Sequence, residues 1–174
     1  IDEFVAYLNS NSHVNILMGA RVRLLGRQIE RHCSRHCLGR LFATAAAATL
    51  GLPVYDTQCG AKLIRVDERT RSLFEEPFIT KWLFDVELLA RYLATEPEIS
   101  LDPKSMTIHE LPLQQWRDVD GSKVKPTDSL KAIGQLATIY RKYRRALPHS
   151  DRKAEEDTKS SPSDSSPSAE PASA

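Results

Sequence analysis

The sequence has few cysteines and no apolar run long enough to cross a bilayer. Its 174 residues include three cysteines, an odd and small number that excludes a dense disulfide scaffold and favours a reducing compartment. The longest uncharged run, residues 41–55, contains Pro53 and is shorter than the ~20 apolar residues of a membrane-spanning helix. The start of the chain lacks a basic segment followed by an apolar stretch, so no signal peptide is predicted. These absences together favour a cytoplasmic location.

The C-terminal segment lacks the side chains that build a core. From His149 onward there is no aromatic residue and no Val, Ile, Leu or Met, and Ser and Pro fill 11 of the 26 positions. Such a composition cannot bury enough apolar surface to offset the entropy lost on ordering. We therefore expect residues 148–174 to be a disordered, Ser/Pro-rich acidic tail and residues 1–147 to form one folded domain.

The net charge of +1 hides an uneven distribution. The last 26 residues hold 3 basic and 6 acidic side chains, so residues 1–148 hold 21 basic and 17 acidic ones. A dedicated duplex-nucleic-acid-binding protein usually carries more positive charge and concentrates it more strongly. Nucleic acid is therefore not the expected partner, although a small basic nucleic-acid-binding protein stays an alternative.

Segments typical of strands alternate with segments typical of helices, which indicates an α/β domain. Residues 14–18, 61–66 and 106–113 read as strands, and Pro112 favours an edge position for the last of them. Helices are expected at residues 2–8, 22–50, 67–74, 85–95 and 128–147. The second of these ends at Gly51-Leu52-Pro53, a helix-stop signal.

Four arginines recur at intervals of four residues within the long predicted helix: Arg23, Arg27, Arg31 and Arg35. On a helix they would share one face, where like charges repel. Phosphate groups of a nucleotide, a lipid headgroup or a nucleic acid would stabilise such a face. An ordinary solvated helix face is the alternative.

The segment His32-Cys33-Ser34-Arg35-His36-Cys37 has a spacing that can hold a metal ion. The neighbouring arginines oppose a dication, and both cysteines fall on the apolar side of the predicted helix. Core cysteines with surface histidines are the preferred interpretation. Cys59 is likewise read as a small buried side chain rather than a nucleophile.

Three polar segments could contribute to a site. The loop containing Asp56, Gln58 and Lys62 can present side chains, although Asp56 could also be a simple turn residue. Asp85 and Glu87 begin a predicted helix, where Asp85 is either an N-cap or a carboxylate that orients or deprotonates a hydroxyl. Gly121-Ser122-Lys123 is either a phosphate-contacting loop or a plain hairpin turn.

These motifs occur in a recognisable order. They are Gly19-Ala20-Arg21, the Asp56-Thr57-Gln58-Cys59-Gly60-x-Lys62 segment, Trp82-x-Phe84-Asp85-Val86-Glu87-Leu88-Leu89, Glu110-x-Pro112 and Gly121-Ser122-Lys123. Together they resemble the C-terminal half of a family-two (GT-A) inverting polyprenyl-phosphate glycosyltransferase, with the dolichyl-phosphate β-glucosyltransferase branch as the best match. The resemblance covers about residues 1–147. It implies a nucleotide-diphospho-sugar transferase-like α/β domain with a mixed sheet and flanking helices.

The resemblance also implies the chemistry. Members of the family transfer a sugar from a nucleotide sugar to a polyprenyl phosphate at a membrane surface, with Mg²⁺ or Mn²⁺ holding the diphosphate. The residues of the second and third motifs favour glucose over mannose as the transferred sugar. Asp85 and Glu87 would face the reacting centre, with Asp85 orienting the acceptor and serving as the base if one is needed. Substrate contacts would come from Arg21, Arg27, Asp56, Gln58, Lys62, Trp82, Trp116, Ser122 and Lys123; Ala20 replaces the family's usual Ser.

The sequence departs from the family in one large respect. No Asp-x-Asp metal motif precedes Gly19, and Asp118-Val119-Asp120 lies on the wrong side of the fold. We therefore expect the N-terminal nucleotide-binding half to be absent, no metal ligand to lie in this chain, and the chain alone not to transfer sugar. A non-catalytic binding module derived from such a domain is the main alternative. A peripheral module on the cytoplasmic face of an anionic membrane is another, favoured by the basic residues at 141–145.

Overall fold

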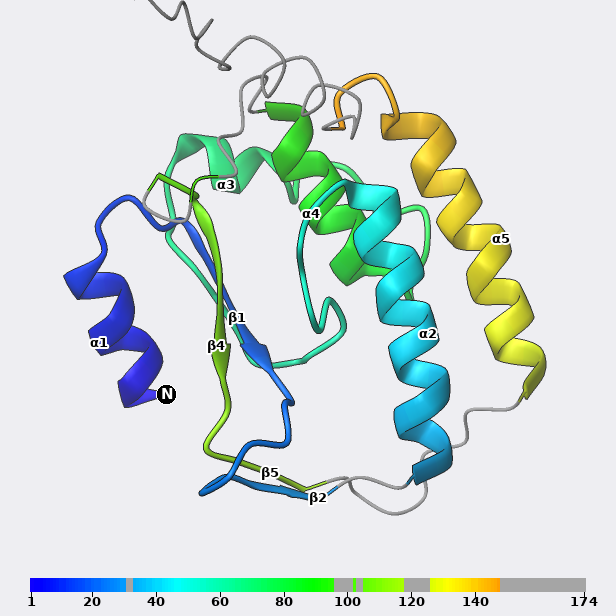
Figure 1. The fold of residues 1–174 in the computed structure, drawn as a ribbon. Helices are drawn as coiled ribbons and strands as arrows, with labels where there is room; N and C mark the ends of the chain where they lie inside the picture. Colours follow the sequence, from blue (N-terminus) through cyan, green and yellow to red (C-terminus); the bar gives the residue numbers. More distant parts are fainter. Residues whose placement is uncertain (31–32, 96–101, 103–104, 118–125, 148–174) are drawn as a thin grey trace, which may run out of the picture.

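A mixed three-stranded sheet lies at the centre of the computed structural model, which describes residues 1–30, 33–95, 102, 105–117 and 126–147 (Figure 1). The middle strand is β1 (Ile16–Ala20), and the sheet order is β3–β1–β4. β3 (Lys62–Ile64) pairs antiparallel with β1, whereas β4 (Ile108–Pro112) pairs in parallel with it. The predicted α/β class with a mixed sheet is confirmed, and Pro112 does end an outer strand of this sheet.

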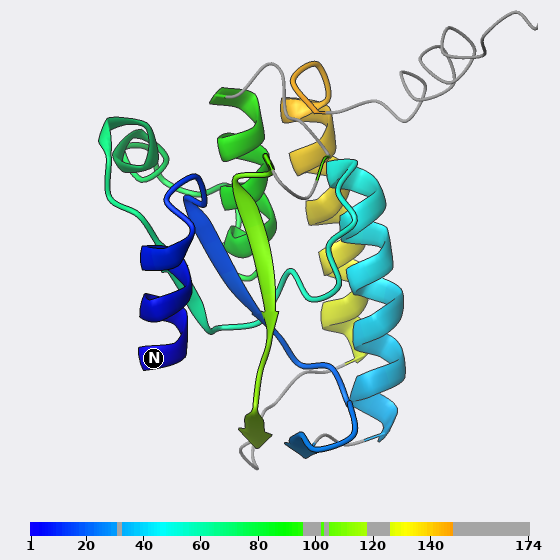
Figure 2. The same ribbon diagram turned by 60° about the vertical axis from the view of Figure 1, so that its left-hand side comes forward.

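Helices cover both faces of the sheet (Figure 2). Helix α1 (Asp2–Ser10) packs on one face, where Phe4 and Leu8 meet Leu17 of β1. Helices α2 (Cys33–Leu50), α4 (Phe84–Thr95) and α5 (Pro126–Tyr143) cover the other face. Ile16 and Met18 of β1 join that larger core. Because successive strand residues point to opposite faces, a strand covered on both sides is apolar throughout, as Ile16–Ala20 is.

Helix α4 is buried along most of its length, with every residue from Asp85 to Leu93 buried. A helix that is buried all round needs neighbours on several sides. Its neighbours are α2 and α5, with which it shares the larger core. The packing fixes the first turn of α4, and with it Asp85, relative to the sheet.

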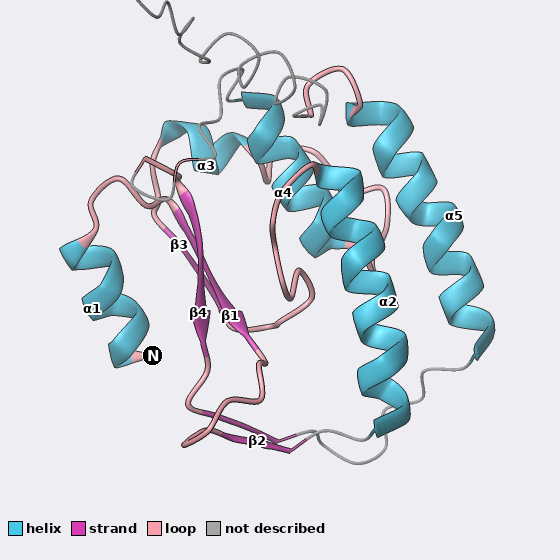
Figure 3. Ribbon diagram, viewed as in Figure 1, coloured by secondary structure: helices cyan, strands magenta, loops and turns pink. Residues whose placement is uncertain are grey.

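The expected helix over residues 22–50 is wrong in its first third. Helix α2 begins at Cys33, and residues Gln28–Glu30 instead form strand β2, paired in parallel with an unexpected strand β5 (Gln115–Arg117) (Figure 3). Gly26 adopts a φ of 82°, a left-handed conformation that interrupts a helix and suits glycine. Arg23 and Arg27 therefore precede β2 and share no helix face with Arg35. Arg31 lies outside the described residues.

The remaining boundaries follow local signals. Gly51 has a φ of 65° directly after α2, as expected of a glycine that ends a helix. Short helix α3 (Glu68–Ser72) starts with a capping box in which Asp67 accepts from the Thr70 N–H and the Thr70 hydroxyl accepts from the Asp67 N–H. The predicted tail, residues 148–174, lies outside the described residues.

Candidate functional site

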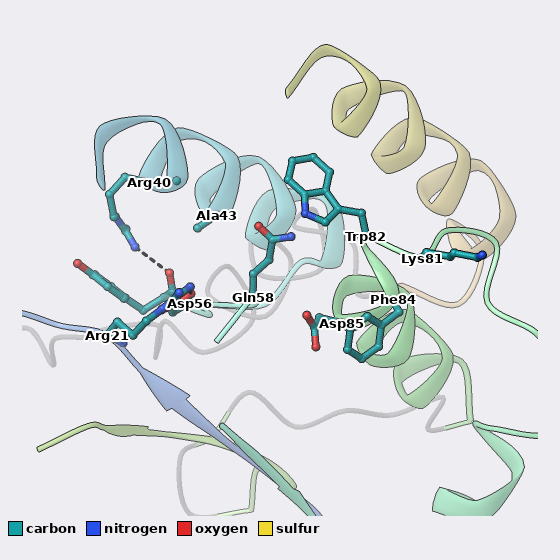
Figure 4. A pocket seen from close by; sticks show the side chains of 11 residues that line it. Arg21, Arg40, Ala43, Asp56, Gln58, Lys81, Trp82, Phe84 and Asp85 are labelled. Carbon is teal, nitrogen blue, oxygen red and sulfur yellow. Dashed lines mark hydrogen bonds and ion pairs between the residues drawn. The ribbon is translucent and has the colours of Figure 1, made fainter. Parts of the chain in front are cut away.

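A cavity of about 340 Å³ opens where β1 ends, between the first half of α2 and the start of α4 (Figure 4). Its walls come from four segments that are far apart in the sequence. Arg21 follows β1, Arg40 and Ala43 belong to α2, and residues 55–58 and 81–85 complete the lining. Open α/β sheets commonly bind ligands at the carboxyl ends of their strands. The cavity is therefore the candidate functional site.

An ion pair between Arg21 and Asp56 forms one wall. Nε of Arg21 lies 2.7 Å from Oδ2 of Asp56, Nη2 lies 2.8 Å from Oδ1, and the Arg21 backbone N–H also donates to Oδ2. The two side chains are only 15% and 8% exposed. Such two-point contacts fix both the position and the orientation of a guanidinium. The Arg21 guanidinium also lies over the ring of Trp116, 5.1 Å from its centroid.

Glu110 of β4 holds the loop that carries Asp56. Its carboxylate accepts from the backbone N–H groups of Tyr55, at 2.6 Å, and Asp56, at 2.8 Å. Burial raises the pKa of Glu110, and these two hydrogen bonds lower it only in part. The sequence placed Glu110 in a motif but not in the site; a carboxylate inside a predicted strand was the available signal.

Arg40 supplies a second guanidinium to the cavity. It projects from α2, donates from Nη1 to the backbone oxygen of Tyr55 at 2.7 Å, and lies 3.7 Å from the centroid of the Tyr55 ring. A guanidinium over an aromatic face is held in place by cation–π attraction. Local sequence does not predict this position for Arg40, because nothing in it links Arg40 to a loop fifteen residues later.

Asp85 lines the opposite side of the cavity and is 7% exposed. Helix α4 begins at Phe84, so Asp85 lies inside the first turn and not at the capping position. There the positive end of the helix macrodipole favours a carboxylate. Nζ of Lys62 lies 2.8 Å from Oδ1 of Asp85 and donates to the backbone oxygen of Thr57 at 3.0 Å. Lys62 thus ties the 57–59 loop to Asp85 and does not itself line the cavity.

Glu87 does not face the cavity, contrary to expectation. It is 0% exposed and pairs with Arg91, whose Nη2 lies 2.9 Å from Oε1. Its carboxylate also accepts from the Ile79 N–H and the Tyr143 hydroxyl. The reason is helical geometry: positions two apart on a helix point about 200° apart, so the side of α4 that presents Asp85 cannot present Glu87.

The pair formed by Glu87 and Arg91 organises the segment that leads into the site. Arg91 donates to the backbone oxygens of Leu73, Glu76 and Pro77. Burial alone would lower the pKa of Arg91, but its contacts with Glu87 and Tyr143 raise it overall. Because residues 73–79 run directly into the cavity lining at Lys81 and Trp82, the pair acts as a structural support for the site.

The cavity brings together five of the predicted site residues: Arg21, Asp56, Gln58, Trp82 and Asp85. Trp82 is 40% exposed, and Figure 4 shows its indole above Gln58, across the cavity from Arg21. Arg27 and Trp116 lie outside the lining; Nη1 of Arg27 lies 3.4 Å from the backbone oxygen of Pro112. Ser122 and Lys123 lie outside the described residues.

The structure describes Cys59 but not the side chains of the His32–Cys37 segment. Cys59 is fully buried, and burial raises its thiol pKa, which opposes formation of the nucleophilic thiolate. His32 and the side chains of Cys33, His36 and Cys37 lie outside the described part of the chain. Within the described part, no three His, Cys, Asp or Glu side chains are grouped so as to hold a metal ion. None of the helices described there combines the length and apolar character of a membrane-spanning segment.

The chain is homologous to glycosyltransferases. It is 31% identical over 133 residues to the dolichyl-phosphate β-glucosyltransferase of Saccharomyces cerevisiae, which covers 74% of this chain and 36% of that protein. It is 29% identical over 154 residues to a Trichomonas vaginalis protein of the same description, and that match covers 84% of this chain and 42% of the relative. It is 37% identical over 91 residues to a dolichyl-phosphate β-glucosyltransferase from Dictyostelium discoideum, and that match covers 52% of this chain and 24% of the relative. The chain thus spans less than half the length of these relatives. No protein-family model and no solved structure matches it.

These matches define a distant relationship to dolichyl-phosphate β-glucosyltransferases over part of their length. They agree with the resemblance inferred from the motifs. The GT-A assignment, the half of the enzyme represented and the roles of individual residues remain predictions.

Proposed function

We propose that this chain forms the acceptor side of a glucosyltransferase domain that transfers glucose from a nucleotide sugar to a dolichyl or other polyprenyl phosphate. One observation carries the proposal: two guanidinium groups, those of Arg21 and Arg40, and the carboxylate of Asp85 line a single cavity. Guanidinium groups are suited to bind phosphate oxygens. The relationship to dolichyl-phosphate β-glucosyltransferases supplies the substrate class.

The residues divide between binding and positioning. Arg40 contacts the acceptor phosphate, and Trp82, half exposed at the cavity wall, offers an aromatic face to the sugar ring. Arg21 is held rigidly by Asp56, so its guanidinium is oriented before a ligand arrives. Such preorganisation reduces the entropy lost on binding.

Asp85 orients the acceptor at the reacting centre. A phosphate acceptor is already anionic, so little general-base catalysis is needed for its oxygen to attack the sugar. The ion pair with Lys62 fixes the Asp85 carboxylate against the 57–59 loop. Its task is then to position a sugar or acceptor hydroxyl rather than to remove a proton.

Mg²⁺ or Mn²⁺, which the resemblance implies, does not fit the described carboxylates. Asp56 is paired with Arg21, Asp85 with Lys62, and Glu110 with two backbone N–H groups. A divalent cation would have to displace these partners, and no third carboxylate joins any of them. We assign no step to a metal at the described residues.

The phosphate-binding part of the proposal can be tested with citronellyl phosphate, a short water-soluble polyprenyl phosphate, by isothermal titration calorimetry. Arg40→Met should weaken binding by about tenfold or more, since a charge-assisted hydrogen bond contributes about 1.5–3 kcal/mol. Arg141→Met, which removes an exposed guanidinium from α5, is the matched control and should bind as the unaltered chain does. Equal losses in both variants, or no binding by the unaltered chain, would contradict the proposal.

Turnover distinguishes the enzyme from a non-catalytic binding module. UDP-glucose and GDP-mannose are offered as donors with citronellyl phosphate and Mg²⁺. The lack of an Asp-x-Asp motif before Gly19 predicts no transfer by this chain alone, and clear product would overturn that prediction. Phosphate binding without turnover, in a longer chain that includes an Asp-x-Asp motif, would favour the binding module.

A further inference from the structure

The turn between β1 and β2 exposes two leucines. Leu25 is 104% exposed, more than any other large apolar side chain in the described ranges, and Leu24 is 49% exposed. The Arg27 N–H donates to the Leu24 carbonyl at 3.1 Å, and Gly26 has a φ of 82°. These are the features of a tight type II turn with Leu25 at its first central position. We call residues 23–27 the leucine turn.

The leucine turn projects from an ordered frame. On its N-terminal side, the Leu113 N–H donates to the Ala20 carbonyl at 2.9 Å, and Arg21 is paired with Asp56. On its C-terminal side, β2 pairs with β5, and the Ile29 side chain is buried. The two leucines are thus held outward although they add nothing to the core. Turn positions of this type are normally occupied by Pro or polar residues, so the exposed leucines indicate a surface contact.

The charge beside the leucines selects the partner. Arg23 and Arg27 flank the two leucines, and residues 22–29 contain no acidic residue. Apolar side chains flanked by cations match the interface of a bilayer, where the apolar groups enter the acyl boundary and the cations remain beside anionic headgroups. We propose that Leu24 and Leu25 insert into an anionic lipid surface, with Arg23 and Arg27 at the level of the headgroups.

The leucine turn lies close to the cavity, so its membrane contact would serve the proposed function, on which this step rests. Leu24 is three residues from Arg21, which lines the cavity, and three extended residues span at most about 10 Å. A leucine turn inserted in the bilayer would keep the cavity beside the membrane surface. The phosphate of a membrane-anchored polyprenyl chain lies at that surface.

Vesicle flotation of the whole chain tests the proposal. The probes are phosphatidylcholine vesicles with and without phosphatidylserine. We expect binding to the anionic vesicles, weakened about tenfold or more in the double variant Leu24→Ser/Leu25→Ser, because each buried leucine side chain contributes strongly to insertion. Val66→Ser is the matched control: Val66 is 70% exposed and follows β3 at the other end of the sheet, so its removal should leave binding unchanged.

Three outcomes would overturn the proposal: no binding to anionic vesicles, equal binding by the double variant, or an equal loss with Val66→Ser. Sedimentation velocity provides a further check, since self-association lost in the double variant would mean that the turn contacts a second copy of the chain. Both leucines are exposed, so the unfolding midpoint should not change. Citronellyl phosphate binding without vesicles should also persist in the double variant, which separates this proposal from the proposed function.

Discussion

Arg21 and Asp56, 35 residues apart in the chain, form a two-point ion pair with separations of 2.7 and 2.8 Å at the edge of the cavity. The pair joins the end of β1 to the loop after α2. Glu110 holds the same loop through the backbone N–H of Asp56. Three separate segments are thereby fixed in one arrangement, and four predictions concern what this arrangement and its surroundings contribute.

Asp56→Asn should lower the free energy of unfolding by about 3 kcal/mol, because it leaves the largely buried Arg21 guanidinium without its counter-charge. Urea denaturation measures the change. The control is Glu30→Gln, which breaks the pair between Glu30 and Arg117, whose side chains are 71% and 86% exposed. That loss should stay below about 1 kcal/mol. Similar losses in the two variants would contradict the structural role given to Asp56.

Glu87→Gln should lower the free energy of unfolding by about 3 kcal/mol, since it leaves Arg91 buried without a carboxylate. The folded variant should still bind citronellyl phosphate, because Glu87 does not line the cavity and Arg91 can keep its contacts with the backbone oxygens of residues 73–77. Denaturation and calorimetry on the same preparation test both parts. Unchanged stability with lost binding would restore the earlier expectation that Glu87 faces the reacting centre.

The pKa of Glu110 predicts a pH dependence of stability. Burial raises this pKa above its ordinary value of 4.5, so the folded chain binds the proton more tightly than the unfolded chain does. The resulting stabilisation is complete below about pH 4.5 and is lost as the pH rises through the pKa of the folded state. Glu110→Gln cannot ionise and lacks this dependence. As the pH rises from about 4 to about 7, the unfolding free energy of the unaltered chain should therefore fall relative to that of the variant. A difference between the two that does not change with pH would exclude the predicted pKa shift.

Gly19→Ala should destabilise the chain, whereas Gly134→Ala should stabilise it. A Cβ at Gly19 would lie 2.9 Å from Cδ2 of Leu113 and 3.1 Å from Cβ of Ala61, an overpacking that costs about 1–3 kcal/mol. At Gly134, on α5, nothing lies within 4 Å of the added atom, so the better helix propensity of Ala should add about 0.5–1 kcal/mol. Thermal unfolding of the two variants should shift in opposite directions, and a common direction would contradict the packing at Gly19.

The first third of the helix expected over residues 22–50 is not helical, and the reason lies in a long-range strand pairing. Leu25, Ile29 and Cys33 recur every four residues, which is a helical pattern. Strand β2 forms because Gln28 and Gln115 pair across 87 positions of sequence, and no window of local sequence contains that partner. The turn at Gly26 was the one local sign that the helix could not begin so early.

Of the two carboxylates predicted at the start of the same helix, Asp85 lines the cavity and Glu87 does not. The sequence located the helix that carries them, because its apolar positions repeat with helical spacing. It grouped the two carboxylates by their proximity in the chain, whereas a helix directs positions two apart to opposite sides. The cavity retains Asp85, and the core retains Glu87 with Arg91.

The sequence by itself determined the α/β class, the buried strand β1, the end of α2 at Gly51 and the relationship to glycosyltransferases, because these depend on local periodicity, stop signals and motif order. Only the tertiary structure decided that Arg40 lies over Tyr55, that Glu110 holds Asp56, and that Leu25 stands exposed beside the site. Glu110 and Asp56 are 54 residues apart. The contacts that shape the cavity join such distant segments, and packing around the sheet, not local preference, brings them together.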